Sequence, residues 1–234
     1  MSFIDKTNIV IKKNNNDLYY FDIDKDIVLT KINNKNDILL PKILFTGDYS
    51  FVDIWLDTNE KDNIYGIIND KKGKILNLNI EEDNIDKHTM IKYDYKNFIV
   101  KFPYTKHISN IKHTIYYSIN KSIPLLANLI HIYEDDNIYV KNTIDFIDYN
   151  ILSNFVIAYS NNRPIIFYFK LVDKFEELFV STFDLNSRSW SKPIQITKSN
   201  KNKIYLSVLQ DENSNYHIVF SENHDNKYYC KYVN

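Results

Sequence analysis

Cysteine, alanine and glycine are all scarce in this sequence, and each scarcity is informative. A single cysteine, Cys230, cannot form an internal disulfide, and we expect it to be a small buried residue on a strand. Only two of the 234 residues are alanine, the best helix former, which disfavours a helical fold. Gly47, Gly66 and Gly73 are the only glycines, and their spacing excludes a glycine-rich phosphate-binding loop.

The charged residues indicate no polyanionic partner. The 29 basic and 30 acidic residues give a formal net charge of −1, and only Arg163 and Arg188 are arginine. Arginine is the usual bidentate ligand of phosphate groups, so we expect no nucleic-acid partner.

The sequence contains no HExxH motif and no Cys/His cluster with zinc spacing, so we expect no metal and no cofactor. The six histidines are expected on the surface, although His107 and His113 flank one turn and could meet across a hairpin.

Long hydrophobic runs are also missing. No run approaches the roughly 20 apolar residues that a membrane-spanning helix needs. The segment Met1–Lys6 lacks the basic-then-apolar pattern of a signal peptide. The expected location is therefore the cytoplasm, with a surface-associated location as the alternative.

What is abundant is the chemistry of β-strands. Tyrosine and phenylalanine together number 33, and they combine with Ile and Val in short runs. β-Branched and aromatic residues pack well on pleated surfaces. The runs are separated by polar segments such as Lys12–Asp17, and we expect Asn and Asp to take the left-handed turn positions that glycine usually fills.

A repeat is visible in these strands. An apolar strand, a polar turn and a second strand recur, and the second strands begin near Leu18, Ile64, Ile111, Pro164 and Tyr216. The intervals of 46 to 53 residues are close to the length of a propeller blade of four short strands. The sequence therefore predicts an all-β fold, a five-bladed β-propeller of four-stranded antiparallel blades. A β-sandwich with evenly spaced strands is the alternative, and a helix is possible over Ser122–Glu134.

The predicted blades form one domain, residues 1–234. They cover residues 8–48, 49–96, 97–150, 151–199 and 200–234, and the last blade is completed by residues 1–7. The fifth repeat ends after its third strand, at Tyr228–Val233, so we expect Phe3–Asp5 to supply the missing outer strand and close the ring.

One segment carries a family signature. Thr182, Asp184 and Trp190 resemble the Asp-box of sialidase-like propellers, Ser/Thr-x-Asp-x-Gly-x-x-Trp, with Asn186 in place of the glycine and one extra residue before the tryptophan. In that family the carboxylate caps turn amides and the tryptophan packs between strands, so the resemblance implies architecture. The count of five blades is also similar to that of tachylectin-like lectins and five-bladed glycosidases. A sialidase needs three arginines for the substrate carboxylate, and only two are present, so we do not expect that activity of the chain acting alone.

The expected function is recognition without catalysis, of a protein or glycan ligand at the propeller's funnel or rim, with the oligomeric state open. Aromatic side chains stack on sugar rings and anchor partners. The candidate ligand-binding residues are Trp55, Asp57, Tyr104, Tyr159, Tyr205 and Asp211.

Two alternatives stay open. The first is a five-bladed glycosidase that uses carboxylates of the inner strands, for which Asp53, Asp57 and Asp211 are the candidates. Asp57 and Asp211 stand in matching copies of the repeat, where capping a turn is the ordinary role. The second alternative is a structural assembly domain of a longer protein.

Overall fold

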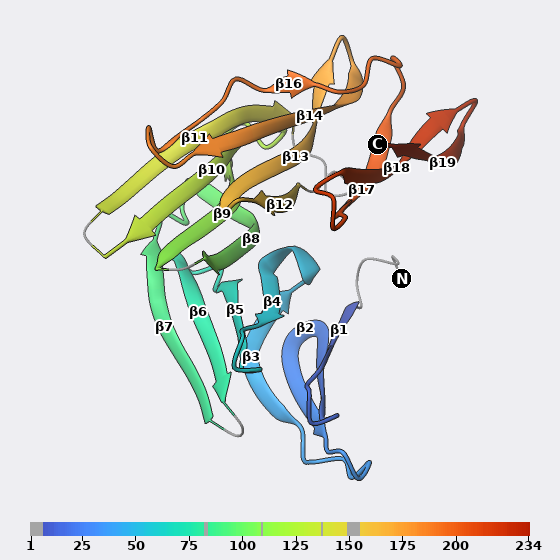
Figure 1. Cartoon of the computed structure of the whole chain (residues 1–234). Coiled ribbons are helices and arrows are strands. Elements are labelled where there is room, and N and C mark those ends of the chain that lie inside the picture. The colour runs from blue at the N-terminus through green and yellow to red at the C-terminus, as the bar shows by residue number, and fades with distance from the viewer. Residues whose placement is uncertain (1–6, 82–83, 109, 137, 149–154) are drawn as a thin grey trace. The chain divides into compact units, whose positions relative to one another are not determined.

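The structure is a computed structural model that describes residues 7–81, 84–108, 110–136, 138–148 and 155–234. Its strands form five antiparallel sheets that follow one another along the chain (Figure 1). The first sheet contains β1 (Thr7–Lys12), β2 (Leu18–Ile32) and β3 (Lys42–Tyr49). The second contains β4 (Ile54–Thr58), β5 (Ile64–Asn69), β6 (Lys74–Glu81) and β7 (Asn84–Lys92), and a short 3-10 turn, η1 (Phe51–Asp53), precedes it.

The remaining three sheets repeat the same plan. The third contains β8 (Phe98–Ile108), β9 (Ile111–Asn120), β10 (Leu126–Asp135) and β11 (Ile138–Asp148). The fourth contains β12 (Val156–Ser160), β13 (Arg163–Val172), β14 (Phe175–Asp184) and two short strands that both pair with β14, β15 (Ser189–Trp190) and β16 (Ile194–Gln195). The fifth contains β17 (Lys203–Gln210), β18 (Tyr216–His224) and β19 (Lys227–Val233).

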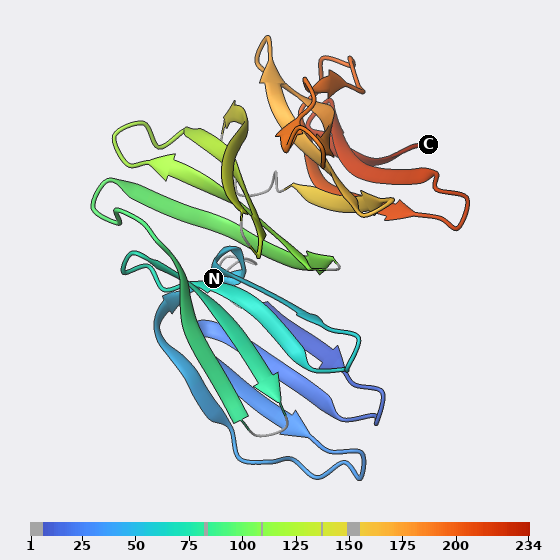
Figure 2. The same cartoon turned by 60° about the vertical axis from the view of Figure 1, so that its left-hand side comes forward.

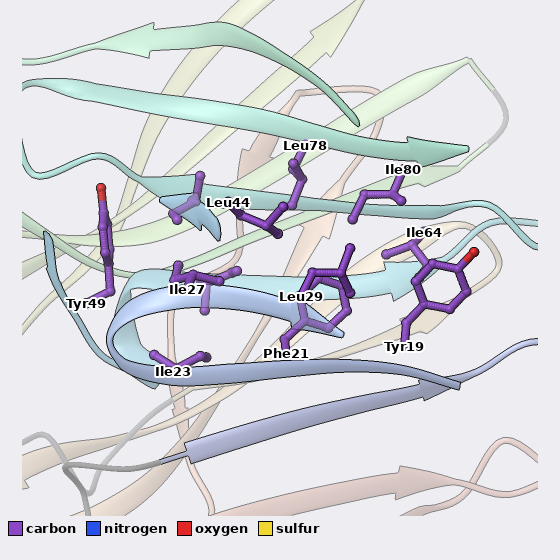
Figure 3. Close-up of a cluster of buried hydrophobic side chains, with 12 residues drawn as sticks. Tyr19, Phe21, Ile23, Ile27, Leu29, Leu44, Tyr49, Ile64, Leu78 and Ile80 are labelled. Atoms are coloured by element: carbon purple, nitrogen blue, oxygen red, sulfur yellow. The ribbon is translucent and has the colours of Figure 1, made fainter. Parts of the chain in front are cut away.

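This organisation confirms the predicted fold class, a five-bladed β-propeller. In the first blade, the long strand β2 forms two consecutive strand segments, each with its own partner. It pairs with β1 up to Ile23 and with β3 from Lys25 onward, and Lys25 has a φ of 66°. Figure 3 shows β2 turning back on itself between Ile23 and Ile27. The predicted closing strand, Phe3–Asp5, lies outside the described residues.

The chain divides into two compact units, the N-terminal unit (residues 1–105) and the C-terminal unit (residues 106–234). The core of the N-terminal unit lies between the first and second sheets, whose strands lie side by side in Figures 1 and 2. In Figure 3 the side chains of Phe21, Leu29, Leu44 and Leu78 point toward one another from both sheets. They alternate along their strands with residues that face away, because successive side chains of a β-strand point to opposite faces of the sheet.

The C-terminal unit has a similar core between its fourth and fifth sheets. Phe167, Phe169, Leu178, Ile218 and Phe220 are buried there and pack together. Phe169 and Phe220 meet edge to face, with ring centroids 6.1 Å apart. The aromatic and β-branched composition of the sequence is thus used for packing between neighbouring sheets.

Asn and Asp shape the hairpins, as the shortage of glycine predicts. Asn59 Oδ1 accepts hydrogen bonds from the backbone N–H of Lys61 at 3.0 Å and of Asn63 at 2.9 Å. Asp62 in the same turn has a φ of 62°. Asn33, Asp70 and Asp211 cap their hairpins in the same way, each bonding the second and fourth amides after it.

The possible helix over Ser122–Glu134 is wrong, because Leu126–Asp135 forms β10. This strand pairs with a neighbour on each side and six of its residues, Leu129–Tyr133 and Ala127, are buried. A strand covered on both faces has a continuous apolar run instead of an alternating one, so its sequence resembles a helix. No helix among the described residues is long and apolar enough to cross a membrane.

Candidate functional site

The four aromatic residues among the predicted site residues lie on the first strand of their sheets. Trp55 is on β4, Tyr104 on β8, Tyr159 on β12 and Tyr205 on β17. Trp55 and Tyr104 belong to the N-terminal unit and the other two to the C-terminal unit. Tyr205 is exposed and stands at an irregularity of the β17–β18 register, with a φ of 60°.

Trp55 and Tyr104 come together in the N-terminal unit. Their ring centroids are 4.7 Å apart, and Tyr65 of β5 contacts Trp55 at 5.7 Å. Asp57 joins this aromatic cluster because the Tyr65 hydroxyl donates to its Oδ2 at 3.4 Å. All four side chains are half-buried. The cluster therefore presents aromatic surface beside one carboxylate.

Asp53 is not part of an open site. It is fully buried, its Oδ1 lies 2.8 Å from Nζ of Lys101, and its Oδ2 lies 3.0 Å from Nζ of Lys71. The backbone N–H and hydroxyl of Ser50 donate to the same Oδ2. Asp53 therefore joins η1 to β8 electrostatically.

Asp211 caps the hairpin between β17 and β18. Its Oδ1 accepts from the backbone N–H of Asn213 at 2.9 Å and of Asn215 at 2.8 Å. Hydrogen bonds from the Asn215 side chain and backbone, with a further one from His217, hold the pKa of Asp211 down at about 2. The matching residue in the second sheet is the cap Asn59, not Asp57, so the predicted equivalence of Asp57 and Asp211 is wrong.

The second oxygen of Asp211 begins a hydrogen-bonded relay. Its Oδ2 lies 3.1 Å from Nε2 of His217, and Nδ1 of His217 lies 2.6 Å from the hydroxyl of Tyr232. An ionised carboxylate only accepts, so Nε2 carries the proton and Nδ1 is the acceptor for the Tyr232 O–H. We call these three residues the Asp–His–Tyr relay.

The relay lies on the face of the fifth sheet opposite its core. Ile218 and Phe220 of β18 are buried against the fourth sheet, and His217 and Val219 alternate with them. Tyr232 of β19 pairs with Val219 and is 58% exposed. A tyrosine that donates to a histidine, which a carboxylate orients, has the arrangement of an activated nucleophile or base. His217 and Tyr232 were missed by sequence reasoning, because only the register of β18 and β19 brings them together.

Two histidines that were expected on the surface are buried in the C-terminal unit. His113 and His131 are fully buried, and Nδ1 of His113 lies 3.0 Å from Nε2 of His131. This partner of His113 on β10 was not predicted, since the sequence suggested only that His113 and His107 could meet across a hairpin. Tyr159 is a neighbour of this pair, with its ring centroid 6.3 Å from that of His113.

The Asp-box-like turn has the predicted capping. Asp184 Oδ1 accepts from the backbone N–H of Asn186 at 2.7 Å and of Ser187 at 3.0 Å. These bonds, that of Ser187 foremost, lower the pKa of Asp184. Arg188 adopts a left-handed backbone conformation, with a φ of 52°, and this conformation accommodates the extra residue before Trp190. Thr182 lies in β14 and pairs across the sheet with Ile165.

Cys230 is exposed, so the expectation of a buried cysteine is wrong. Among the described residues, no three His, Cys, Asp or Glu side chains are grouped to hold a metal ion.

No family model and no curated protein matches the sequence. Solved structures do share the fold. Over 96% of the chain, an ulvan lyase of polysaccharide lyase family PL25 gives a TM-score of 0.63 at 12% identity, and the chain spans 63% of that protein's length. A structure of a PL25 ulvan lyase bound to -[GlcA(1-4)Rha3S]- gives a TM-score of 0.61 at 8% identity, covering 96% of this chain and 67% of that one. The catalytic domain of a GH62 α-L-arabinofuranosidase from Coprinopsis cinerea gives a TM-score of 0.51 at 8% identity, covering 98% of this chain and 90% of that one.

At such identities the likeness shows the fold alone. The functional prediction is nevertheless corrected, because the ulvan lyase and the arabinofuranosidase are enzymes that act on carbohydrates. The expectations of a non-catalytic recognition module, and of a chain that is not an enzyme, are overturned by this finding. The enzyme alternative is the one that the comparisons favour.

Proposed function

We propose that the chain is a carbohydrate-active enzyme that cleaves a polysaccharide by β-elimination at a uronic acid unit. The observation that carries this proposal is the Asp–His–Tyr relay, with 3.1 Å between Asp211 and His217 and 2.6 Å between His217 and Tyr232. The chain is similar in fold to polysaccharide lyases of family PL25, and one of these structures is bound to -[GlcA(1-4)Rha3S]-. This similarity supports the choice of substrate class.

The relay supplies the proton transfers of the reaction. His217 Nδ1 takes the phenolic proton, and the Tyr232 oxygen removes the proton from C5, which is acidic because it stands next to the carboxylate. The C5–H electron pair becomes the C4–C5 double bond as the C4–O bond breaks. The imidazolium of His217 returns its proton to the departing oxygen, so the enzyme ends as it began. Asp211 is ionised at neutral pH and stabilises the imidazolium.

A second candidate reaction, hydrolysis, is favoured by the aromatic cluster of the N-terminal unit. Trp55, Tyr65 and Tyr104 offer apolar ring surface to a sugar, and the half-buried Asp57 is placed beside them. A carboxyl group beside a bound sugar is one of the two carboxyl groups that glycosidases use. Asp57 and the cluster are thus proposed as the sugar-contacting residues of the N-terminal unit in hydrolysis.

The test is turnover of uronic-acid polysaccharides by the full chain, followed by the ultraviolet absorbance of the new double bond and by reducing ends. Tyr232→Phe removes the base, and we expect the rate of double-bond formation to fall about a hundredfold or more. Tyr228→Phe is the matched control, because Tyr228 is also an exposed tyrosine of β19 and lies outside the relay. We expect it to keep the wild-type rate.

Two results would reject elimination by the relay. One is full double-bond formation by Tyr232→Phe. The other is release of reducing ends without a double bond, abolished by Asp57→Asn and not by Tyr232→Phe, which would establish hydrolysis instead.

A further inference from the structure

The carboxylate of Asp211 is surrounded by hydrogen-bond donors that fill its lone-pair sites. The backbone N–H groups of Asn213 and Asn215 donate to Oδ1, and Nε2 of His217 donates to Oδ2 at 3.1 Å. The side chain of Asn215 is a further donor, because its Nδ2 lies 3.0 Å from the same Oδ2. Asn215 and His217 therefore share one oxygen of the relay's carboxylate.

The first sheet contains the same turn with the two side chains exchanged. Asn33 caps that turn, since its Oδ1 accepts from the backbone N–H of Lys35 and of Asp37. Nδ2 of Asn33 donates to Oδ2 of Asp37, four residues later, at 3.0 Å. The bridge between the cap and the fourth residue after it is thus a feature of the turn that either order of Asn and Asp can make. In the fifth sheet the order places the carboxylate on the cap and the donor on Asn215.

This order of side chains decides which nitrogen of His217 carries the proton. Because the cap is a carboxylate, Nε2 is the donor to Asp211 and Nδ1 is left to accept the hydroxyl proton of Tyr232. An Asn at the cap would present an N–H to Nε2. His217 would then carry its proton on Nδ1 and donate it to Tyr232, which is the wrong direction for the relay.

Asp211 and Tyr232 are the titratable groups in direct contact with His217 on its two neighbouring strands. On β17 the residue paired with His217 is the apolar Leu209, and on β19 the ring of Tyr232 stacks on the imidazole, with centroids 5.9 Å apart. Glu212 of the turn is exposed, so solvent screens its charge. Two further titratable residues of β19 pair with more distant residues of β18, Tyr228 with Asn223 and Cys230 with Ser221. The proton on His217 is therefore governed by the hydrogen bonds of Asp211.

We propose that Asn215 is a positioning residue of the relay, which holds Oδ2 of Asp211 on His217 and moderates the attraction of that oxygen for the proton. The inference rests on the proposed function, since it concerns how the relay is poised for proton transfer. Without the Asn215 bond, Oδ2 keeps more of its negative charge and stabilises the imidazolium of His217 more strongly. Less neutral imidazole is then present to accept the proton of Tyr232. Asn215 thus keeps His217 neutral down to a lower pH.

The experiment is a nitrogen NMR titration of the histidines in the full chain, together with the pH profile of double-bond formation. Asn215→Ala keeps the backbone N–H to Oδ1 and loses the donor to Oδ2. We expect the pH at which His217 gains its proton to rise by about half a unit, and the acid limb of the pH profile to rise with it. A turn that merely loosened would separate Asp211 from His217 and lower that pH, so the sign separates the two effects.

Asn63→Ala is the matched control. Asn63 also stands four residues after a cap, Asn59, and its backbone N–H donates to that cap, but its side chain donates to Glu81 instead. It should leave the His217 titration unchanged. A second variant, Asp211→Asn combined with Asn215→Asp, reproduces the order of the first sheet. We expect it to fold, and its nitrogen spectrum should show the proton of His217 on Nδ1.

The proposal is overturned if His217 in Asn215→Ala gains its proton at the wild-type pH or below it, or if Asn63→Ala raises that pH equally. It is also overturned if the exchanged variant keeps the proton on Nε2. Failure of the proposed function has a different signature. The wild-type chain would form no double bond, while the His217 titration still responded to Asn215→Ala, which would reject elimination and support the role of Asn215 in the relay.

Discussion

His113 and His131 stack in the interior of the C-terminal unit, with ring centroids 5.3 Å apart and an angle of 13° between the ring planes. Nε1 of Trp190 donates to Nδ1 of His131 at 3.1 Å. Because an indole N–H can only donate, His131 carries its proton on Nε2 and donates it to Nδ1 of His113. His113 is therefore protonated on Nε2, a buried atom that has no partner among the described residues.

Acid should destabilise the C-terminal unit through this pair. Burial lowers the pKa of His113 from 6.5 to about 4, and burial together with His113 lowers that of His131. As the pH falls from 6.5 toward 4, the unfolded chain binds protons that the folded chain rejects, so stability falls with pH in that window. His113 alone accounts for about 3 kcal/mol. Denaturant melts across this range should show the loss, and His113→Phe should reduce it. An unchanged pH dependence in His113→Phe would contradict the assignment.

Trp190→Phe should destabilise the same unit by about 2–3 kcal/mol. The change keeps an aromatic ring against Phe183 but removes the N–H donor, which leaves Nδ1 of His131 buried without its partner. The free energy of unfolding from urea titration measures the effect. Trp190→Phe as stable as the wild-type protein would show that the indole hydrogen bond contributes nothing.

Lys203 should be among the residues least tolerant of change. It is fully buried, its Nζ lies 2.9 Å from Glu177 and 3.6 Å from Glu222, and it donates to Ser199 and two backbone carbonyls. Burial raises the pKa of Glu177, but hydrogen bonds from Lys203 and Thr197 outweigh burial and lower it.

Lys203→Met leaves the buried Glu177 without its cation and removes one of the two lysines beside Glu222, so we expect a loss of about 3–5 kcal/mol. Lys198→Met, at an exposed position nearby, is the control and should change stability little. Equal stabilities of the two variants, measured by guanidinium titration, would refute this account of the cluster.

Gly66 holds β4 and β5 close together beside the aromatic cluster. A Cβ atom at this position would lie 2.3 Å from the backbone oxygen of Trp55 and 2.5 Å from a methyl carbon of Leu56. Gly66→Ala should therefore cost about 3 kcal/mol and displace the Trp55 ring. Gly47→Ala meets only the Tyr49 ring, at 3.0 Å, and should cost less. Tryptophan fluorescence during unfolding reports both effects, and identical curves for the two variants would contradict the close approach.

The strand plan could be predicted from the sequence because each hairpin is a local feature. The second strands were expected near Leu18, Ile64, Ile111, Pro164 and Tyr216, and β2, β5, β9, β13 and β18 begin there or one residue earlier. Period-two alternation and Asn/Asp turns carry this information within about twenty residues. The failure over Ser122–Glu134 came from burial by neighbouring strands, which no local pattern reports.

The candidate site depends on contacts between strands, and this is where prediction from the sequence stopped. Asp211 was a candidate, but its alignment with His217 and Tyr232 depends on the register of β17, β18 and β19. The burial of His113 and His131 likewise follows from the packing of Phe183 and Trp190 against them. Composition identified the aromatic residues but could not tell which of them, such as Trp55 and Tyr104, would meet.

The central claim is elimination with Tyr232 as the base, and the mass of the reaction products tests it most directly. Digestion of a glucuronic-acid polysaccharide by the wild-type chain should yield oligosaccharides lighter by one water than hydrolysis products, and Tyr232→Phe should yield almost none. Fragments of full hydrolytic mass, or unsaturated fragments formed equally well by Tyr232→Phe, would contradict the claim.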